Sequence, residues 1–540
     1  MVVGDINKID LSTSFFAKII KEGKLYVDKT RVIENFLKSQ SDVNLVARQR
    51  RMGKSLNMDT VRCFLTDKED LRHLFKGLYI EKSPAWEKAH SAPVFSFDFR
   101  RLVPENLKEK LFDFVSEYIY SYCSLSDLSQ AAKRYIKGDN FADPDGLYLL
   151  TESVYRATGK NSYILIDEYD KFLMDNYGTE RYAEIRDFEK AFLSAGLKGN
   201  PYLEKALVTG VMRVSRESMF SDLNNIKTFD VFEDETYKFD YGFTEEEVRE
   251  LWVMQEFDID KARTWYNGIN VGGNPVYNTY SMASFLDRKK FDCYWGMSGS
   301  MDIIKALLND ERWEVITRLK RGEDVRVPIE NRISLEGLSP TNSEDKAFYS
   351  LLVQGGYLSL KERIDDDWAI VNIPNQELHR VWNSFILQDL IKNPFRARTM
   401  FDNINHAKLF QSDLEYFLTD RMSYHDLGAY KGEDRKKVHE RAYHIFILGM
   451  LSAFEGADSK RPPSNRESGD GRYDIMVEMP DVCVIFELKS CGEGESPEKA
   501  AEEALMQIEI SRYGAEVGDG RQLVKVGIGF LGKRCSVRVA

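Results

Sequence analysis

The sequence has no apolar run of the roughly 18 residues that a membrane-spanning helix needs, and no secretory signal at its N-terminus. Cysteine is scarce: the six residues are scattered, with no C-x-x-C pair. They argue for free thiols in a reducing cytosol and against a disulfide framework or a zinc site. A net charge of −12 argues against a wholly basic DNA binder, although it is compatible with a local basic groove. We therefore expect a cytoplasmic protein without a membrane partner.

Length and composition indicate several globular domains. With 43% hydrophobic and 30% charged residues, the chain falls in the range of globular proteins, and 540 residues exceed what one core usually holds. The sequence pattern divides the chain into three segments, 1–240, 241–402 and 403–540.

The first segment alternates short apolar runs with long helix-like stretches. Strands that are apolar throughout and are separated by helices predict a parallel sheet covered on both faces. The clearest strand-like runs are Val43–Ala47, Val94–Phe99, Tyr163–Ile166 and Ala206–Thr209.

The second segment begins with a helix signal, because Thr244 precedes three glutamates. Further on, Ala347–Gln354 has the pattern of an amphipathic helix, and two glycines follow it. The runs Tyr357–Leu360 and Ala369–Ile373 then predict a hairpin. A helix followed by a hairpin suggests a small winged-helix-like module.

The third segment has the pattern of a separate α/β unit. It predicts helices and strands in the order helix, strand, strand, helix, strand, strand. Their ranges are Val438–Phe454, Tyr473–Val477, Val482–Leu488, Ser496–Tyr513, Leu523–Phe530 and Cys535–Val539.

A phosphate-binding loop is predicted after the first apolar strand. The strand leads into Gly53-Lys54-Ser55, in the strand, loop and helix order of the pattern G-x-x-x-x-G-K-[ST], although Arg48 occupies the position of the first glycine. Gly53 allows backbone N–H groups to approach phosphate oxygens, Lys54 bridges the β- and γ-phosphates, and Ser55 ligates Mg²⁺. By itself the tripeptide also fits an ordinary loop with an exposed lysine.

A second element strengthens the prediction. Tyr163–Ile166 is followed by Asp167 and Glu168, the pattern of a Walker B strand. Asp167 is expected to hold Mg²⁺ and Glu168 to orient the attacking water. Because both signals stand at strand ends and in the right order, we predict a P-loop ATPase that uses ATP and Mg²⁺.

Several further residues are candidates for contacts with the nucleotide. Thr209 ends a predicted strand and is expected to sense the γ-phosphate. Arg213 and Arg216 follow it, and each fits either a finger arginine or an ion pair. Arg48 or its neighbours Arg50 and Arg51 are expected to add positive charge near the phosphates, although a contact to DNA or solvent fits them as well.

The chain resembles the predicted AAA-ATPase-like family, and the resemblance spans nearly all of it. In that family the loop usually has an Arg-Pro-Arg-Arg-like sequence without the first glycine of the common pattern. Here Gln49 replaces the proline, and Met52 replaces a usual aromatic residue. The resemblance implies a C-terminal PD-(D/E)XK nuclease-like domain. The matching runs are Leu25–Thr30, Arg48–Met58, Ile166–Asp170, Thr209–Arg213, Ser215–Asn225, Tyr241–Glu245, Gln354–Leu358 and Ile373–Glu377.

A second candidate site lies in the third segment. Alternation along a strand places Glu487 and Lys489 on one face, and Asp474 is expected to reach the same point from the neighbouring strand. The two carboxylates are suited to Mg²⁺, and Lys489 to orienting or deprotonating a water molecule. A solvated strand edge with an ion pair gives the same pattern.

From about Glu440 to Val539 the chain is similar to the PD-(D/E)XK nuclease superfamily. The similarity implies that Glu440 on the preceding helix completes the metal shell, with Glu467 as another candidate, and that Gln507 and Tyr513 belong to a glutamine-containing helix motif. Some members of such families bind nucleic acid without cleaving it, so the activity of the site stays open.

The fold class that we predict is α/β: a P-loop NTPase sheet, a helical and winged-helix-like lid segment (residues 241–402), and a PD-(D/E)XK restriction-endonuclease-like domain. The expected function is an ATPase that controls a Mg²⁺-dependent nuclease acting on nucleic acid, DNA rather than RNA. The alternative is a nucleotide-dependent switch of the STAND kind, with a homo-oligomeric state that responds to ATP and a C-terminal domain that only binds. A protein with both sites decayed is the third interpretation.

Overall fold

The structure is a computed structural model, and it divides the chain into two compact units. The first consists of Met1–Trp313 and Asp324–Leu378, and the second of Glu314–Glu323 and His379–Ala540. The residues described are 1–102, 106–138, 143–212, 225–295, 304, 307–320, 322–331, 333, 345–382, 404, 406–421, 443–444, 446–447, 467–468, 471–478, 482–491, 494–513 and 521–540.

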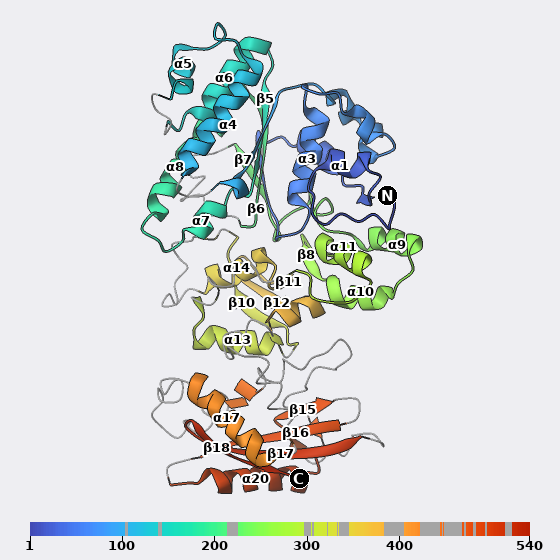
Figure 1. The fold of residues 1–540 in the computed structure, drawn as a ribbon, viewed down its shortest axis with the longest axis vertical. Coiled ribbons are helices and arrows are strands. Elements are labelled where there is room, and N and C mark those ends of the chain that lie inside the picture. The colour runs from blue at the N-terminus through green and yellow to red at the C-terminus, as the bar shows by residue number, and fades with distance from the viewer. Residues whose placement is uncertain are drawn as a thin grey trace. The chain divides into compact units, whose positions relative to one another are not determined.

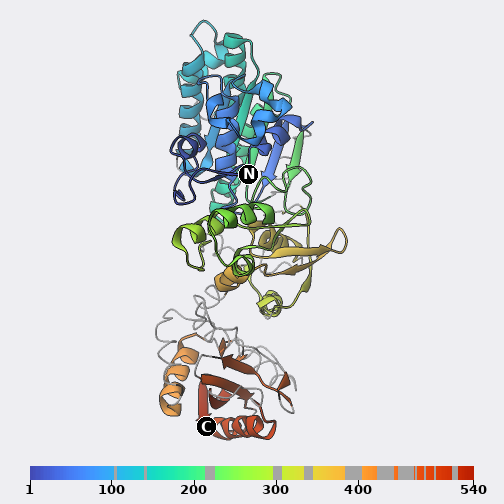
Figure 2. The same cartoon turned by 90° about the vertical axis from the view of Figure 1, so that its right-hand side faces the viewer.

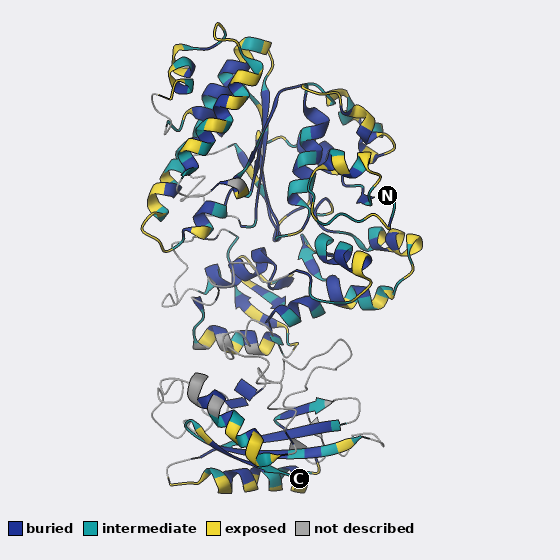
Figure 3. Cartoon of the chain, viewed as in Figure 1, coloured by how far each residue is buried: buried dark blue, intermediate teal, exposed yellow. Residues whose placement is uncertain are grey.

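A five-stranded parallel sheet forms the centre of the first unit. Its strands run in the order β4-β5-β6-β3-β7, and every neighbouring pair is parallel. All four predicted strands are confirmed, and β7 is an addition. Most of the side chains of β3 and β5 are apolar, and both strands are buried at every residue (Figure 3). The bounds are β3 Val43–Ala47, β4 Val94–Asp98, β5 Ser162–Asp167, β6 Leu203–Gly210 and β7 Ile226–Phe229.

Helices cover both faces of this sheet. The helices α4, α6 and α8 lie on one face, and α1 and α3 on the other (Figure 1). Packing between α6 and α8 is close, because a Cβ atom on Gly196 would lie 2.5 Å from the Cβ atom of Leu147. The bounds are α1 Phe16–Lys21, α3 Lys54–Leu65, α4 Leu107–Tyr122, α6 Gly146–Thr158 and α8 Tyr182–Leu197.

The lid segment starts with the predicted helix. Thr244 and Glu247 form a capping box at the start of α9 (Glu245–Met254), in which each side chain accepts a hydrogen bond from the backbone N–H of the other. An apolar cluster of Val248, Trp265 and Phe285 then joins α9 to two more helices. These are α10 (Ile259–Tyr266) and α11 (Thr279–Arg288), with the hairpin β8 (Ile269–Val271) and β9 (Asn274–Val276) between them.

The predicted helix and hairpin follow later in the lid segment. Helix α14 (Lys346–Gly355) ends at Gly356, whose φ of +85° is a conformation that favours glycine. The strands β11 (Ser359–Arg363) and β12 (Trp368–Asn372) pair as the hairpin. The sequence did not reveal β10 (Val325–Pro328), which pairs with β12 and makes a three-stranded sheet.

The second unit contains a four-stranded mixed sheet in the order β15-β16-β17-β18. The pair β16/β17 is parallel and the other two pairs are antiparallel. Phe486 and Leu488 face the core shared with α17 (Ala407–Arg421), and Cys483 and Ile485 face α20 (Pro497–Ile510). The four predicted strands and the predicted helix between the second and third of them, α20, are confirmed. Most of the predicted helix 438–454 lies outside the described residues. The strands are β15 Ile475–Glu478, β16 Val482–Ser490, β17 Gln522–Leu531 and β18 Arg534–Val539.

Figure 2 shows the same chain from a second side, with the parallel sheet and its helices grouped at the N-terminal end of the chain.

Of the helices that the structure describes, none combines the length and apolar character required to cross a membrane.

Candidate functional site

The predicted magnesium ligands meet at one edge of the parallel sheet. Because the strands are parallel, their carboxyl ends lie along the same edge. There the Ser55 hydroxyl donates a hydrogen bond to Asp167 Oδ2 at 2.5 Å, and the Thr209 hydroxyl donates to Asp167 Oδ1 at 2.6 Å. The fold thus brings Ser55, Asp167 and Thr209 together from α3, β5 and β6.

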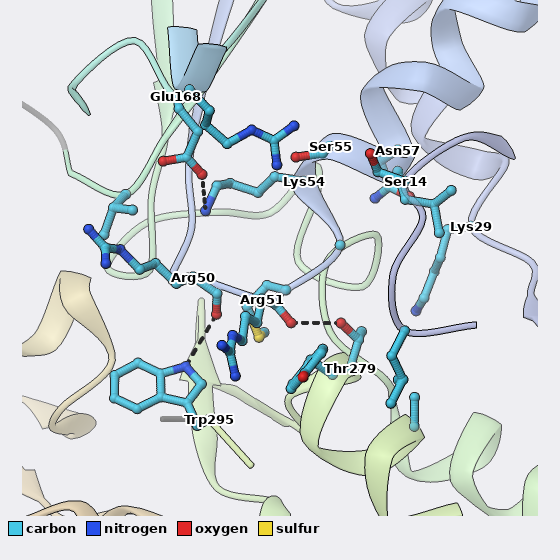
Figure 4. A pocket seen from close by; sticks show the side chains of 18 of the residues that line it. Ser14, Lys29, Arg50, Arg51, Lys54, Ser55, Asn57, Glu168, Thr279 and Trp295 are labelled. Carbon is cyan, nitrogen blue, oxygen red and sulfur yellow. Dashed lines mark hydrogen bonds and ion pairs between the residues drawn. The ribbon is translucent and has the colours of Figure 1, made fainter. Parts of the chain in front are cut away.

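The phosphate loop has the local geometry that its sequence predicts. Gly53 is the N-cap of α3 with a φ of +85°, so glycine serves the turn into the helix. Lys54 Nζ donates to the carbonyl oxygens of Arg48 and Gln49, at 2.9 and 3.0 Å, and lies 3.7 Å from Glu168 Oε1 (Figure 4). The lysine therefore spans the loop and reaches the second Walker B carboxylate.

The environment of Asp167 suits a divalent cation. Burial raises the pKa of Asp167, and the hydrogen bonds from Ser55 and Thr209 partly oppose that shift. The carboxylate and the Ser55 hydroxyl offer the oxygen ligands that Mg²⁺ prefers. Among the described residues, no group of three or more His, Cys, Asp or Glu side chains has an arrangement that could hold a metal ion by itself.

The expectation for Arg48 is wrong. Its side chain is fully buried and points away from the loop, where Nη1 donates to the carbonyl oxygens of Ala47 and Phe229 at 2.8 and 3.2 Å. The guanidinium also forms an ion pair with buried Asp234 and lies 5.6 Å from the ring of Tyr241. Arg48 is therefore a structural cation, and it is not among the residues that line the cavity described below.

The other predicted arginines divide into two groups. Arg51 lines the cavity, but its guanidinium lies 4.2 Å from the ring of Tyr280 and donates to the Tyr294 carbonyl oxygen. Its contact with phosphate stays a prediction. Arg213 and Arg216 lie outside the described residues.

A cavity of about 740 Å³ opens at this edge, a volume within the range of ligand pockets. The lid segment closes part of it by hydrogen bonds to the phosphate loop. The Thr279 hydroxyl donates to the Arg51 carbonyl oxygen at 2.8 Å, and Trp295 Nε1 donates to the Arg50 carbonyl oxygen at 3.3 Å (Figure 4). Neither residue was predicted, since no local pattern marks a residue that bonds to a loop more than 200 positions away.

The sequence analysis also missed Arg100, which lines the same cavity. It follows β4, the strand next to β5, and Nη2 lies 3.4 Å from Asp167 Oδ2. An arginine that follows an apolar strand is not a recognisable motif. Only the order of strands in the sheet, with β4 beside β5, reveals that Arg100 lies close to Asp167.

The second unit brings together the carboxylates predicted there. Ile475 pairs with Phe486 in the antiparallel register, which sets Asp474 opposite Glu487. Asp474 Oδ2 accepts a hydrogen bond from the Leu488 backbone N–H at 2.8 Å, so Asp474 does reach across from the neighbouring strand as predicted.

Two glycines that the sequence did not reveal shape this site. In the parallel register Gly527 lies beside Glu487 and Gly529 beside Lys489. A Cβ atom on Gly529 would lie 2.1 Å from the Pro497 carbonyl oxygen, and one on Gly527 would also collide with α20. Their lack of side chains lets α20 approach the sheet.

That approach joins the helix to the lysine of the site, since Lys489 Nζ donates to Gln507 Oε1 at 2.8 Å. Burial raises the pKa of Asp474, and Glu487 is also buried, so a cation here would compensate two poorly solvated carboxyl groups. Glu440 lies outside the described residues, and so does the side chain of Glu467.

Comparison with known proteins supports both parts. Residues 10–220 match the family model described as predicted AAA-ATPase, and residues 438–539 match that of the PD-(D/E)XK nuclease superfamily. A protein of Azotobacter chroococcum mcd 1, described as an uncharacterized protein in the vnfD 5' region, is 29% identical over 313 residues, which are 56% of this chain and 57% of that relative. The chain thus spans little more than half the length of that relative.

A Walker-type ATPase of Pyrococcus abyssi is a further similar structure, with 16% identity and a TM-score of 0.33 over 66% of this chain and 94% of that one. The two family matches coincide with the parallel sheet carrying the phosphate loop and with the mixed sheet carrying the carboxylates. The chain therefore combines an N-terminal domain of the predicted AAA-ATPase-like family with a C-terminal domain of the PD-(D/E)XK nuclease superfamily.

Proposed function

We propose that the first unit binds ATP with Mg²⁺ and hydrolyses it. The observation that carries this proposal is the bonding of Ser55 and Thr209 to one carboxylate, Asp167, while Lys54 reaches Glu168. Mg²⁺, when bound by Ser55 and Asp167, supplies charge compensation to the phosphate oxygens.

In the reaction that we propose, Glu168 orients a water molecule toward the γ-phosphorus. A bond forms between the water oxygen and phosphorus while the bond to the β–γ bridging oxygen breaks. ADP leaves with that electron pair, and the proton that the water loses passes to a phosphate oxygen. Lys54 holds the β- and γ-phosphate oxygens, and Thr209 keeps Asp167 in place. The positive φ of Glu168, +59°, supports a role for this residue, since unusual backbone conformations concentrate at functional sites.

We further propose that the second unit cleaves nucleic acid, DNA rather than RNA. Asp474 and Glu487, together with Glu440, would hold Mg²⁺. Lys489, positioned by Gln507, would orient the water that attacks the phosphodiester phosphorus, and the bond to the leaving sugar oxygen would break. The support is the placement of Asp474 opposite Glu487 and the hydrogen bond between Lys489 and Gln507. In this arrangement residues 1–240 form the ATPase, 241–402 the lid segment and 403–540 the nuclease-like domain.

One observation favours a nucleotide-dependent switch as the second candidate. Carbonyl oxygens of the phosphate loop accept hydrogen bonds from Thr279 and Trp295 of the lid segment. A ligand that moves the loop would therefore act directly on the lid segment. In this alternative, ATP binding changes a homo-oligomeric state and the C-terminal domain binds nucleic acid without cleaving it.

The experiment that tests these proposals measures ATP hydrolysis and cleavage of single- and double-stranded DNA and RNA, with Mg²⁺ or Mn²⁺, with and without ATP. We expect Lys54→Ala to abolish ATP hydrolysis, and Asp474→Ala to abolish cleavage while hydrolysis continues. Absence of cleavage by the wild-type protein would reject the nuclease half. Failure of the wild-type protein to bind ATP would instead support decay of the first site.

The switch has a separate readout. Size-exclusion chromatography with ATP, with ADP and without nucleotide compares the molecular mass of the three states. A mass that depends on ATP, together with slow hydrolysis, supports the switch. A mass that is the same in all three conditions counts against it.

A further inference from the structure

Arg100 lies next to the proposed magnesium ligand Asp167, although it belongs to neither sequence motif of the site. The 3₁₀ turn η4 (Phe99–Arg101) follows directly on β4. In the parallel register Asp98 of β4 pairs with Asp167 of β5, so this turn begins at the sheet edge beside the catalytic carboxylates.

The guanidinium of Arg100 is held by Asp98, and the side chain is partly exposed. Nε and Nη2 donate to the two carboxylate oxygens of Asp98 at 2.8 and 2.9 Å, a bidentate arrangement that fixes its plane. Nη2 also lies 3.4 Å from Asp167 Oδ2, the oxygen that accepts the hydrogen bond from Ser55. The side chain is 44% exposed, so it has room to shift within the cavity.

Three of the other cationic side chains that line the cavity have partners other than these ligands. Lys29 pairs with Glu247, Arg51 donates to the Tyr294 carbonyl oxygen, and Lys171 pairs with Asp175. Lys54 and Arg100, in contrast, lie within ion-pair distance of the Walker B carboxylates, Lys54 at Glu168 and Arg100 at Asp167.

We propose that Arg100 is a cis-acting arginine that contacts the γ-phosphate of bound ATP. The inference rests on the proposed ATPase function. A divalent cation and a guanidinium compete for the same oxygen of Asp167, so loading of the cation frees Arg100 from that contact. Asp98 keeps the guanidinium at the sheet edge, on the lining of the cavity in which the phosphates would lie.

The role matches the charge requirement of phosphoryl transfer. Negative charge on the transferred phosphoryl group must be compensated, and an arginine is suited to this because its fork binds phosphate oxygens in a bidentate manner. Asp98, Asp167 and Glu168 already place three carboxylates at this edge. Lys54 by itself does not balance these three carboxylates, and Arg100 supplies a second positive charge.

A matched control exists elsewhere in the chain. Arg72 makes the same bidentate pair with Asp70, two residues earlier, at 2.9 and 2.6 Å, but it is not among the residues that line the cavity. Arg72→Ala therefore removes the same local interaction without touching the site.

The test compares Arg100→Ala, Arg100→Lys and Arg72→Ala in a Glu168→Gln background, with titration calorimetry of ATP and of ADP in the presence of Mg²⁺. Loss of a charged hydrogen bond to the γ-phosphate predicts that Arg100→Ala weakens ATP binding by about tenfold or more and ADP binding by less than about twofold. Arg100→Lys should recover part of the ATP affinity, and Arg72→Ala should change neither. With Glu168 intact, Arg100→Ala should lower kcat by about a hundredfold or more.

Two results separate failure of this inference from failure of the ATPase proposal. If wild-type protein binds and hydrolyses ATP but Arg100→Ala behaves as Arg72→Ala, or weakens ATP and ADP equally, Arg100 does not contact the γ-phosphate. If the wild-type protein binds no ATP, the ATPase proposal fails and this inference fails with it. Equal thermal unfolding midpoints for Arg100→Ala and Arg100→Lys establish that a difference in ATP affinity between them is not a folding defect.

Discussion

Single residues at the phosphate loop have roles that their positions in the motif do not reveal. Arg48 stands where the common loop pattern has glycine, yet its guanidinium is buried against Asp234 and does not line the cavity. A buried charge is costly to leave without its partner. The arginine is therefore part of what holds the strand ends in place.

Arg48→Gly restores the usual motif, and we expect it to destabilise the protein nonetheless. It leaves Asp234 buried without its cation, which costs about 3–5 kcal/mol in comparable buried pairs. ATP affinity should fall or stay the same. Thermal unfolding and nucleotide titration measure the two effects.

Arg48→Met combined with Asp234→Asn is the matched control. It removes both charges, keeps a side-chain oxygen for the backbone N–H groups of Thr236 and Tyr237, and should recover part of the lost stability. Normal stability of Arg48→Gly, or a gain in its ATP affinity, would contradict the structural role of Arg48.

A second residue links stability to pH. Burial raises the pKa of Asp240 from 3.8 to about 7, against the opposing hydrogen bond from Asn35. The folded state therefore holds this proton more tightly than the unfolded state, and the stabilisation is complete below pH ~4 and is lost as the pH rises through ~7. In that window the carboxyl group lowers the free energy of unfolding by up to about 1.4 kcal/mol per pH unit.

Asp240→Asn removes this titration. Between pH 5 and pH 8 we expect the variant to gain stability relative to wild type, that is, its free energy of unfolding should rise relative to that of wild type. Calorimetric unfolding at several pH values measures it, with Asp366→Asn in an exposed loop as the control. Parallel pH profiles of Asp240→Asn and wild type would refute the assignment.

At the scale of elements, the phosphate loop and the lid segment form one hydrogen-bonded assembly. The buried Glu377 carboxylate accepts hydrogen bonds from the backbone N–H groups of Tyr294 and Trp295, at 2.7 and 2.8 Å. This fixes the short segment from which Trp295 reaches the Arg50 carbonyl oxygen. Gly356, after α14, adds a close contact, because a Cβ atom there would lie 2.4 Å from the Gln49 side chain.

Trp295→Phe tests this coupling, since it removes the indole N–H and keeps an aromatic ring. Loss of one such hydrogen bond is worth about 1 kcal/mol, so we expect ATP binding to weaken by about fivefold. Trp252→Phe is the control, because Trp252 Nε1 makes a similar bond to the Phe257 carbonyl oxygen, outside the cavity lining. Equal ATP affinity of the two variants would show that the Trp295 bond does not shape the loop.

At the scale of the whole molecule, the two sites proposed for phosphate chemistry occur in one chain but in separate compact units. The described residues of the Lys54 and Asp167 site come from the first unit, and those of the Asp474 site from the second. Any control of one site by the other must then pass between the units. The comparison of Lys54→Ala and Asp474→Ala is informative for this reason, because each variant disables one unit.

Strands and local caps were predictable from the sequence, because the forces that form them act between near neighbours. Unbroken apolar runs made β3 and β5 recognisable, and Thr244 with Glu247 marked the start of α9. Strand β10 was missed, since its short run Val325–Pro328 contains only two buried apolar side chains and depends on β12 for its pairing.

The sequence alone indicated the two candidate sites: Lys54 and Ser55 at the start of α3 with Asp167 at the end of β5, and Asp474, Glu487 and Lys489 on or beside two strands of the second unit. Few residue types suit the binding of phosphate and Mg²⁺, so sites proposed for these ligands form readable motifs. Only the tertiary structure decided the surroundings. Burial of Arg48, approach of Arg100 to Asp167 and closure by Trp295 depend on contacts between distant residues, which strand order and packing create and no local pattern records.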